Sequence, residues 1–422
     1  MESKRNYKTI VIGGGAGGLF FCSAQAENKS NSKTLILEKN NKAGLKLLMS
    51  GGGQCNLTHG GSIKDFLSHY GKKGASIRSC LYKFNNIHMS RFFETLEVEL
   101  IEREDQKIFP KSLSARQVQL ALLNKAIENG VEVAYNQNVV GILPQGNGFW
   151  VTSASKENNK CSTYWCENLV IAAGGCSFPD TGSDGHILHL ISKDLSVPVV
   201  TPKPALTPVY VENYPFECAS GVSIGNVSMK IHCNMLGKLR NDLFTGDILF
   251  THKNLSGPVI LNASRYLNAG DVIELNFVYP KNFDDVSVKL KSSFQGSSKE
   301  IFSFITNEFR LPKSFVEALF LSDNIAHKKM SSLSGQEMRL VASKLSESKY
   351  SVTGLSGFDK AMVTAGGVDL SAVNLKTMES IQYPGLFFIG EVLDVDGDTG
   401  GYNLQFAYSS ARSAKEKICG DV

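Results

Sequence analysis

The sequence has no closely paired cysteines of the kind that bind metals or form a redox relay. Its nine cysteines are scattered over 422 residues, and none stand in a C-x-x-C pattern. This spacing argues against a zinc site and against a disulfide framework. We therefore expect reduced thiols, a reducing compartment and a cytoplasmic protein.

Long hydrophobic runs are also missing. No stretch approaches the roughly 18 to 20 consecutive apolar residues that cross a bilayer. Residues 1–8 are polar and lead directly into an apolar run, which leaves no room for a secretion signal. We expect a soluble protein without a membrane partner.

The sequence has little net charge of either sign. Forty-four Lys and Arg against 40 Asp and Glu leave +4, too little to indicate a nucleic-acid partner by itself. Hydrophobic residues make up 42% and charged residues 20%, which is typical of folded globular proteins. A chain of 422 residues suggests two or three domains.

What the sequence does contain is a glycine-rich turn after a short apolar strand. Residues 8–12 (KTIVI) precede GGGAGG at 13–18, in which Gly13, Gly15 and Gly18 fit G-x-G-x-x-G. The three glycines allow a tight turn, close approach of a pyrophosphate, and close helix–strand packing. Helix-forming residues from Leu19 to Asn28 would then point free N–H groups at a phosphate.

A carboxylate follows at the spacing that dinucleotide sites require. The second apolar run, residues 34–37, ends at Glu38, 20 residues after Gly18. Such an acid accepts hydrogen bonds from the adenosine ribose. The strand–turn–helix–strand context predicts dinucleotide binding but leaves FAD and NAD open.

Two later strands favour FAD because each ends in glycine. Residues 131–142, 149–154 and 164–172 predict a β-meander whose last strand runs into Gly174 and Gly175. Residues 386–389 form another buried-type strand, followed by Gly390 and Glu391. Glu391 fits either a ribitol contact or a surface acid, and the N–H groups of residues 401–404 suit a pyrophosphate or a flavin.

Five motifs together resemble the BaiN-like flavoproteins, known also as the aminoacetone-oxidase or NAD(P)/FAD-dependent oxidoreductase family, within the glutathione-reductase-like group. They are GGGAGG (13–18), SGGGQCNLT (50–58), LFTHKNLSGP (249–258), TAGGVDL (364–370) and GEVLDVDGDTGGYNLQFA (390–407). The resemblance implies an α/β fold: a discontinuous Rossmann-type FAD-binding domain with an inserted β-rich, barrel-like domain and a small helical subdomain. Shifts in composition place the FAD-binding domain at residues 1–199 and 351–422. They place the β-rich insert at 200–285 and the helical subdomain at 286–350.

The motifs and the resemblance give one set of predicted cofactor contacts. The set is Gly13, Gly15, Ala16, Gly17, Gly18, Glu38, Lys39, Lys46, Gly52, Gly53, Gln54, Cys55, Asn56, Val139, Ala173, Gly174, Gly175, Gly390, Glu391, Asp394, Gly400, Gly401, Tyr402, Asn403 and Leu404.

Two positions depart from the family pattern. The family usually has arginine where this chain has Leu45 and Gln54. Because arginine is a natural phosphate partner, the loss leaves Lys46 and backbone N–H groups to hold the anion. We expect FAD binding that is weaker for this reason.

The catalytic candidates are His252 and Tyr402. His252, in the LFTHKNLSGP motif, suits proton exchange near neutral pH, and its alternative is a structural histidine. Tyr402 is a second proton donor, or else a packing residue. Cys55 has no partner for a disulfide relay, which favours a structural thiol. We expect no metal, because the alternating Asp394, Asp396 and Asp398 lack the closing Glu of a calcium loop.

The sequence therefore predicts an FAD-dependent oxidoreductase that exchanges a hydride between flavin N5 and a small organic substrate. Activated C=C reduction and amine oxidation both fit. NAD(P)H is a possible electron donor, although no second G-x-G-x-x-G follows a strand in the insert. One alternative is a flavin-binding sensor without catalysis. The other is an RNA-associated flavoprotein of the tRNA-modification type, in which one face would carry Lys238, Arg240, Lys253 and Arg265. Nucleic acid is less favoured as a partner than a small molecule.

Overall fold

The computed structural model describes residues 5–24, 33–233, 238–239, 242–294, 299–323, 325 and 327–420. The chain divides into two compact units. Met1–Lys203 and Met362–Val422 form the discontinuous unit, and Pro204–Ala361 form the inserted unit.

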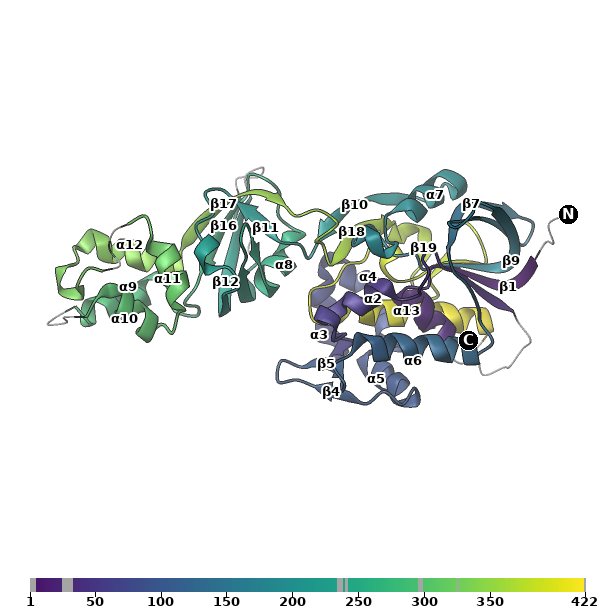
Figure 1. Ribbon diagram of the computed structural model, residues 1–422, viewed down its shortest axis with the longest axis horizontal. Helices are drawn as coiled ribbons and strands as arrows, with labels where there is room; N and C mark the ends of the chain where they lie inside the picture. The colour runs from purple at the N-terminus through teal and green to yellow at the C-terminus, as the bar shows by residue number, and fades with distance from the viewer. Residues whose placement is uncertain are drawn as a thin grey trace. The chain divides into compact units, whose positions relative to one another are not determined.

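A mainly parallel sheet forms the centre of the discontinuous unit (Figure 1). Its strand order is β19–β20–β21–β9–β1–β2–β6, with parallel neighbours from β21 to β6. The strands are β1 (Arg5–Ile12), β2 (Thr34–Leu37), β6 (Glu132–Ala134), β9 (Cys161–Ile171), β19 (Val373–Asn374), β20 (Glu379–Ser380) and β21 (Leu386–Phe388). The apolar run of β1 is buried, as in parallel strands that are covered on both faces.

Three helices pack together beside this sheet. The helix α1 (Ala16–Ser23) contacts both α6 (Ala115–Glu128) and α13 (Tyr402–Cys419). From Gly17 to Ser23, α1 is buried throughout. The helix was expected to reach Asn28 but ends at Ser23, since Ala24 is extended, and residues 25–32 lie outside the described part of the chain.

A β-meander adds to the sheet through β9. It consists of β7 (Gln137–Gln145), β8 (Gly148–Ser155) and the first half of β9, all antiparallel. The helix α7 (His186–Leu195) packs against β7. The meander was predicted at residues 131–142, 149–154 and 164–172, but residues 132–134 form β6, which pairs in parallel with β2 and lies outside the meander.

A mixed segment lies between β2 and β6. It contains a three-stranded sheet of order β3–β5–β4, and its helix α4 packs on α13. The elements are α2 (Leu45–Met49), η1 (Ser50–Gly53), β3 (Thr58–His59), α3 (Ile63–Phe66), η2 (Leu67–Lys73), α4 (Gly74–Lys83), α5 (Asn86–Thr95), β4 (Leu100–Glu102) and β5 (Lys107–Pro110).

The chain leaves and re-enters the discontinuous unit along two paired strands. These are β10 (Val199–Ala205) and β18 (Val363–Val368), which form a separate two-stranded sheet. Short 3-10 turns complete the unit: η3 (Pro179–Thr181), η6 (Leu370–Ala372) and η7 (Gly390–Val392).

A closed antiparallel barrel forms the first part of the inserted unit. Six strands follow the order β12–β14–β15–β11–β17–β16, and β16 pairs back with β12. The elements are β11 (Val209–Val211), β12 (Ser223–Cys233), β14 (Phe244–Phe250), β15 (Leu255–Ser256), β16 (Val272–Asn276) and β17 (Ser348–Leu355), with β13 (Lys238–Leu239) beside β12, and with η4 (Glu217–Ala219) and α8 (Pro258–Ser264).

The boundary placed at residues 350 and 351 requires correction. Residues 351–355 belong to β17, which pairs with β11 and β16 and closes the barrel. The inserted unit therefore runs to Ala361. Composition does not reveal this boundary because β17 lies more than 100 residues from β11 along the chain.

Helices make up the rest of the described part of the inserted unit (Figure 1). They are α9 (Phe283–Ser292), α10 (Ile301–Glu308), α11 (Lys313–Phe320) and α12 (Gly335–Ser346), with η5 (Met330–Ser332). Phe315 of α11 stacks on Phe216 and Phe250, at centroid distances of 5.6 and 5.2 Å, so helices and barrel share one core. A Rossmann-type α/β unit with an inserted barrel and a helical part confirms the predicted fold class.

Candidate functional site

The predicted contacts lie at one edge of the parallel sheet. The strand register pairs Ile12 with both Leu37 and Ile171, and Ile171 with Phe388. The last residues of β1, β2, β9 and β21 therefore form one row, and the glycine turns and Glu38 follow directly. In open α/β sheets, ligands bind at this carboxyl edge.

Two glycines of the turn after β1, Gly13 and Gly18, leave no room for a side chain. Gly13 has φ +99°, and a Cβ there would lie 2.7 Å from the Ala172 carbonyl oxygen. A Cβ on Gly18 would overlap the Gly13 carbonyl oxygen. Gly15 caps α1 without a side-chain hydrogen bond, followed by Ala16 and Gly17, so backbone N–H groups remain at the helix start. The arrangement suits a pyrophosphate.

Glu38 is buried directly beside this turn. Its carboxylate accepts hydrogen bonds from the Gly14 and Asn40 N–H groups, both at 2.8 Å. Burial raises the pKa of Glu38, and the two N–H donors oppose that rise. The carboxylate thus holds the turn in shape and stands where a ribose was expected. The next residue, Lys39, forms an ion pair with Asp184.

Lys46 and Glu391, predicted as separate contacts, form an ion pair. The Lys46 ammonium lies 2.9 and 2.6 Å from the two Glu391 carboxylate oxygens and 2.6 Å from Ser177 Oγ. Glu391 Oε1 also accepts from Ser177 Oγ (2.8 Å) and from the Thr364 N–H (2.9 Å). The Lys46 cation is therefore shared with Glu391 instead of standing free for a phosphate.

The turn after β9, which begins with Gly174 and Gly175, packs against Thr364. Thr364 Oγ1 accepts the N–H groups of Cys176 and Ser177, at 2.8 and 3.1 Å. A Cβ on Gly175 would overlap Thr364, and Gly174 has φ +74°. Ala173 is half-buried before the turn. Thr364 lies in the TAGGVDL motif but was not singled out, because its contact partner is 187 residues away.

The SGGGQCN loop exposes its glycines and buries its cysteine. Gly51, Gly52 and Gly53 are exposed with φ from +56° to +86°. Burial raises the pKa of Cys55 to about 11, so its thiol stays protonated near neutral pH. This environment suits a structural thiol.

A cation that the sequence did not reveal lies beside this loop. Arg103, between β4 and β5, donates to Gln54 Oε1 at 2.6 Å, and its guanidinium lies 4.0 Å from the centre of the Phe109 ring. Gln54 stands where the family usually has arginine, so an arginine from another segment reaches this position. Arg103 and Gln54 are 49 positions apart, and no sequence pattern indicated that they meet.

The start of α13 packs against the segment after the loop. Gly400 and Gly401 have φ +124° and +95°, and a Cβ on Gly401 would lie 2.6 Å from Thr58 Cα. In the orientation that satisfies its neighbours, the Asn56 amide accepts from the Gly401 N–H at 3.2 Å. Asn403 binds back to Gly397, and Leu404 follows in the first turn. The open N-terminus of α13 thus joins the same site.

Tyr402 is the first residue of α13 and is buried. Its ring stacks on His69 at 4.0 Å and on His59 at 5.5 Å. Burial, then the nearby carboxylates of Asp398 and Asp65, raise the pKa of the phenol well above its usual value. Tyr402 packs in this structure, and its role as a proton donor stays a prediction.

Two side chains missed by the sequence, His69 and Lys73, come from η2 and bind aspartates of the loop before α13. His69 Nδ1 lies 2.9 Å from Asp398 Oδ2. Lys73 pairs with Asp394, predicted as a cofactor contact, and lies 3.4 Å from Asp396. The alternating aspartates are thus held by η2, which no motif indicated. Among the described residues, no group of three or more His, Cys, Asp or Glu side chains could hold a metal.

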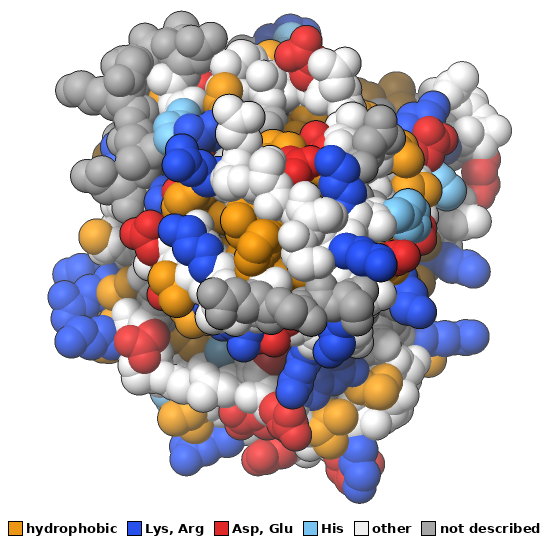
Figure 2. Space-filling view, turned by 90° about the vertical axis from the view of Figure 1, so that its left-hand side faces the viewer, with side chains coloured by type: hydrophobic (Ala, Val, Ile, Leu, Met, Phe, Trp, Pro, Cys, Tyr) orange, Lys and Arg blue, Asp and Glu red, His pale blue; other side chains and the backbone are white. Residues whose placement is uncertain are grey.

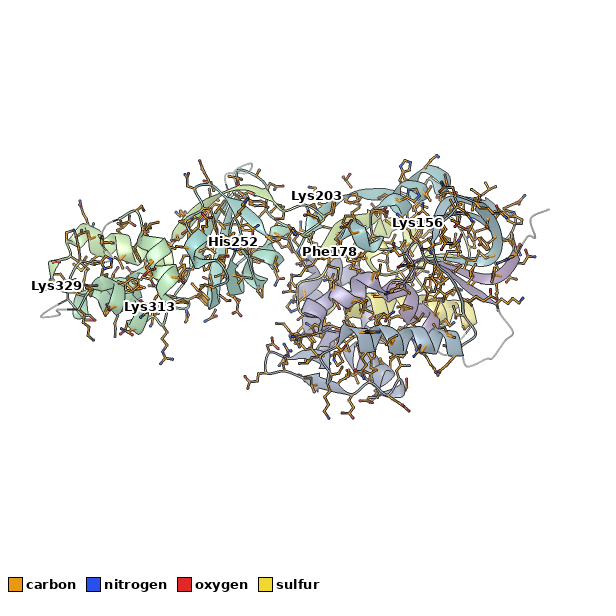
Figure 3. The ribbon with its side chains drawn as sticks, in the orientation of Figure 1. Lys156, Phe178, Lys203, His252, Lys313 and Lys329 are labelled. Atoms are coloured by element: carbon orange, nitrogen blue, oxygen red, sulfur yellow. The ribbon has the colours of Figure 1, made fainter. Side chains whose placement is uncertain are left out.

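Two further predicted residues come from β7 and from the inserted unit, and β7 begins beside Glu38, where the Gln137 N–H donates to the Glu38 carbonyl oxygen at 2.9 Å. Val139 is buried in β7, and its carbonyl oxygen lies 3.1 Å from His186 Nε2. His252 belongs to the inserted unit, where it is exposed in the turn between β14 and β15 (Figure 3). Tyr214 fixes that turn by donating to the Thr251 and Asn254 carbonyls.

The basic residues considered for RNA are only partly described. Lys253 is exposed, and Arg265 lies against the Tyr266 ring. The Lys238 side chain and Arg240 lie outside the described residues. Every helix in the described part of the chain is too short or too polar to span a bilayer.

Comparison with known proteins places the chain in a family. The model of the HI0933-like protein Rossmann domain matches residues 7–417. A ribosomal RNA dihydrouridine synthase of Haemophilus influenzae is 31% identical over 408 residues, which is 96% of each chain. One of Escherichia coli is 29% identical over 98% of each. A 3-dehydro-bile acid delta(4,6)-reductase of Clostridium scindens is 27% identical over 96% of this chain and 98% of that protein.

Solved structures share the fold at low identity. An Escherichia coli quinol–fumarate reductase subunit has a TM-score of 0.53 and 14% identity over all of this chain and 71% of that one. A 3-ketosteroid-delta4-(5alpha)-dehydrogenase of Rhodococcus jostii has a TM-score of 0.50 and 12% identity over 98% of each. The predicted resemblance, cofactor and enzyme class are confirmed. The chain belongs to the HI0933-like Rossmann-domain family and is an FAD-dependent oxidoreductase.

Proposed function

We propose that this oxidoreductase reduces a carbon–carbon double bond conjugated to a carbonyl group, and that its substrate is a uridine of ribosomal RNA. The observation that carries the proposal is the full-length similarity to two proteins named ribosomal RNA dihydrouridine synthases. Dihydrouridine is uridine with two hydrogens added across C5 and C6, a bond conjugated to the C4 carbonyl. Of the two reactions that the sequence left open, this similarity favours reduction over amine oxidation.

The residues at the sheet edge suit FAD. The glycine turn and the start of α1 would take the pyrophosphate, with Glu38 beside the adenosine ribose. Lys46, Ser177 and Glu391 would lie along the ribityl chain. The SGGGQCN loop and the open start of α13 would border the flavin ring. When bound and reduced, FAD supplies the hydride.

The protein must supply the proton. A double bond conjugated to a carbonyl accepts hydride at its far carbon, and the carbon next to the carbonyl then needs a proton. His252 and Tyr402 remain proposed donors, and the raised pKa of Tyr402 disfavours transfer from its phenol at neutral pH. We propose NAD(P)H as the electron source.

An RNA substrate needs cations for its phosphates. The inserted unit exposes several lysines, among them Lys253, Lys313 and Lys329 (Figure 3). On the face that Figure 2 shows, Lys and Arg side chains are spread among acidic and hydrophobic ones and form no single basic stripe. Such a surface fits recognition of a folded RNA at a few phosphates better than strong non-specific binding.

A small molecule with the same chemistry is the second candidate. The Clostridium scindens relative, 27% identical, is named for the reduction of double bonds in a 3-dehydro, that is 3-oxo, compound. A steroid-like enone carries the same conjugated group as uracil. The two candidates therefore differ in the substrate and not in the reaction.

The test starts with anaerobic titration of the yellow protein with NADPH and then NADH. The reduced protein is next mixed with ribosomal RNA from cells that lack the enzyme, or with a 3-oxo-delta4 steroid. Mass spectrometry of digested RNA then measures dihydrouridine. We expect bleaching of the flavin band, and dihydrouridine formation that restores it.

A glycine pair provides the matched control. Gly401→Ala places a Cβ 2.6 Å from Thr58 Cα, at φ +95°, and should abolish FAD retention and turnover. Gly354→Ala, where a Cβ meets nothing within 4 Å, should behave like the wild type. Reduction of the steroid alone would favour the second candidate. If the reduced wild type transferred hydride to neither, the proposed function would be wrong.

A further inference from the structure

Beside the proposed flavin site, one histidine is held by a carboxylate. His69 lies in η2, and its Nδ1 is 2.9 Å from Asp398 Oδ2. The Asp398 N–H also donates to the His69 carbonyl oxygen at 2.9 Å. Side chain and backbone therefore couple the same two residues, although they lie 329 positions apart.

The His69 ring is fixed on a second side by Tyr402. The two rings stack at a centroid distance of 4.0 Å with an interplanar angle of 16°. Tyr70, next to His69, donates its hydroxyl to the Tyr402 carbonyl oxygen at 2.8 Å. Asn403 in turn binds the Gly397 and Asp398 carbonyls, at 2.9 and 3.3 Å. The loop that carries Asp398 and the turn that carries His69 are thus tied to the start of α13.

The other ring nitrogen of His69 is available. Within the described residues, Nε2 makes no hydrogen bond, and 36% of the side chain is exposed. A carboxylate on Nδ1 fixes the tautomer and the orientation of the ring. An imidazole held in this way is arranged to pass a proton through Nε2.

We propose that His69, oriented by Asp398, is the general acid that protonates the substrate carbon next to the carbonyl, in the double-bond reduction proposed above. The hydride, with its electron pair, that adds to the substrate's far carbon would come from FAD when it is bound and reduced. The π electrons of the double bond move toward the carbonyl and form an enolate. The bond between Nε2 and its proton breaks as the C–H bond forms, and solvent then reprotonates His69.

Two other histidines, His59 and His252, lack this support. His59 stacks on the same Tyr402 ring, but its Nδ1 faces the carbonyl oxygen of its neighbour Gly60 at 3.0 Å. His252 is exposed in a turn of the inserted unit, with no carboxylate on its ring among the described residues. His59 is therefore the matched control for a packing role of His69.

The test combines single turnover with a readout that is independent of activity. The reduced holoenzymes of the wild type, His69→Gln, Asp398→Asn and His59→Gln are mixed with RNA that lacks dihydrouridine and with a 3-oxo-delta4 steroid. We expect flavin reoxidation to fall about 100-fold or more for His69→Gln and about tenfold for Asp398→Asn. FAD affinity and the rate of flavin reduction by NAD(P)H should not change, and His59→Gln should stay within about threefold of the wild type.

Proton NMR of the oxidised holoenzyme supplies the second readout. The hydrogen-bonded Nδ1–H of His69 should give a downfield signal that disappears in both His69→Gln and Asp398→Asn but persists in His59→Gln. Added imidazole should restore part of the turnover of His69→Ala, which a purely structural role would not allow.

Three outcomes would overturn the inference. They are wild-type reoxidation in His69→Gln, an equal loss in His59→Gln, or a large loss confined to His252→Gln. A wild-type enzyme that reduces neither probe would instead refute the proposed function, and this inference with it.

Discussion

At the scale of single residues, the site is organised by charged groups that satisfy one another. Lys46 and Glu391 lie 345 positions apart, yet the ammonium contacts both carboxylate oxygens. Only about a quarter of each side chain is exposed. Ser177 Oγ and the Thr364 N–H also donate to the Glu391 carboxylate. Such a network fixes the geometry of a site before any ligand arrives.

Removing the ammonium should therefore weaken cofactor binding. Lys46→Met leaves Glu391 without its cation, and we expect FAD affinity to fall about tenfold, which corresponds to about 1.4 kcal/mol. Fluorescence titration of the FAD-free protein measures the change. Lys111→Met, which breaks the exposed pair with Glu99, should have no effect. Equal affinities for all three proteins would contradict this account.

At the scale of elements, local sequence patterns predicted the motifs but not the distant residues that the motif side chains contact. The strand before Gly13, the turn itself and the acid at Glu38 are near in sequence, and each carries its own signal. The pairs Arg103–Gln54, His69–Asp398 and Lys46–Glu391 join distant segments, and no periodicity marks them.

The same limit applies to the fold. The meander and the strand β21 could be read from alternating and apolar runs. The closing strand β17 could not, because its place in the barrel depends on β11 and β16. The 3-10 segment η2, which carries His69, is only seven residues long. It is too short to show a periodic pattern of apolar residues in the sequence.

One helix cap offers an element-scale prediction. Ser334 forms a capping box with Glu337 at the start of α12, whereas Ser114 precedes α6 without a side-chain hydrogen bond. Ser334→Ala should therefore lower the free energy of unfolding of the inserted unit by about 1 kcal/mol, and Ser114→Ala should cost much less. Urea unfolding followed by circular dichroism checks this pair. A larger effect of Ser114→Ala would show that the cap is not the cause.

At the scale of the whole molecule, four buried thiols link stability to pH. Burial raises the pKa of Cys22, Cys80 and Cys166 to about 12 and that of Cys55 to about 11. All four lie in the discontinuous unit. In the unfolded chain these thiols ionise near their ordinary pKa of 9.0, so above that pH the unfolded state loses protons first.

Stability should consequently fall as pH rises from about 9, because the folded state binds more protons there. By pH 10 each thiol should cost about 1 kcal/mol. The free energy of unfolding at pH 8 and pH 10 measures the loss, which Cys80→Ala should reduce by about 1 kcal/mol. Cys161→Ser, at an exposed position, should leave it unchanged. A pH slope that Cys80→Ala does not alter would assign the loss to other groups.

The return of the chain through β18 has a consequence for biosynthesis. The strand β21, Glu391 of η7 and the helix α13 all follow the inserted unit in sequence. During translation, β1, α1 and β2 emerge first, but their sheet lacks the strand next to β9 until residues 386–388 appear. The inserted unit has its own core and can fold in the meantime. Acquisition of the yellow colour would then mark a chain whose synthesis has passed α13.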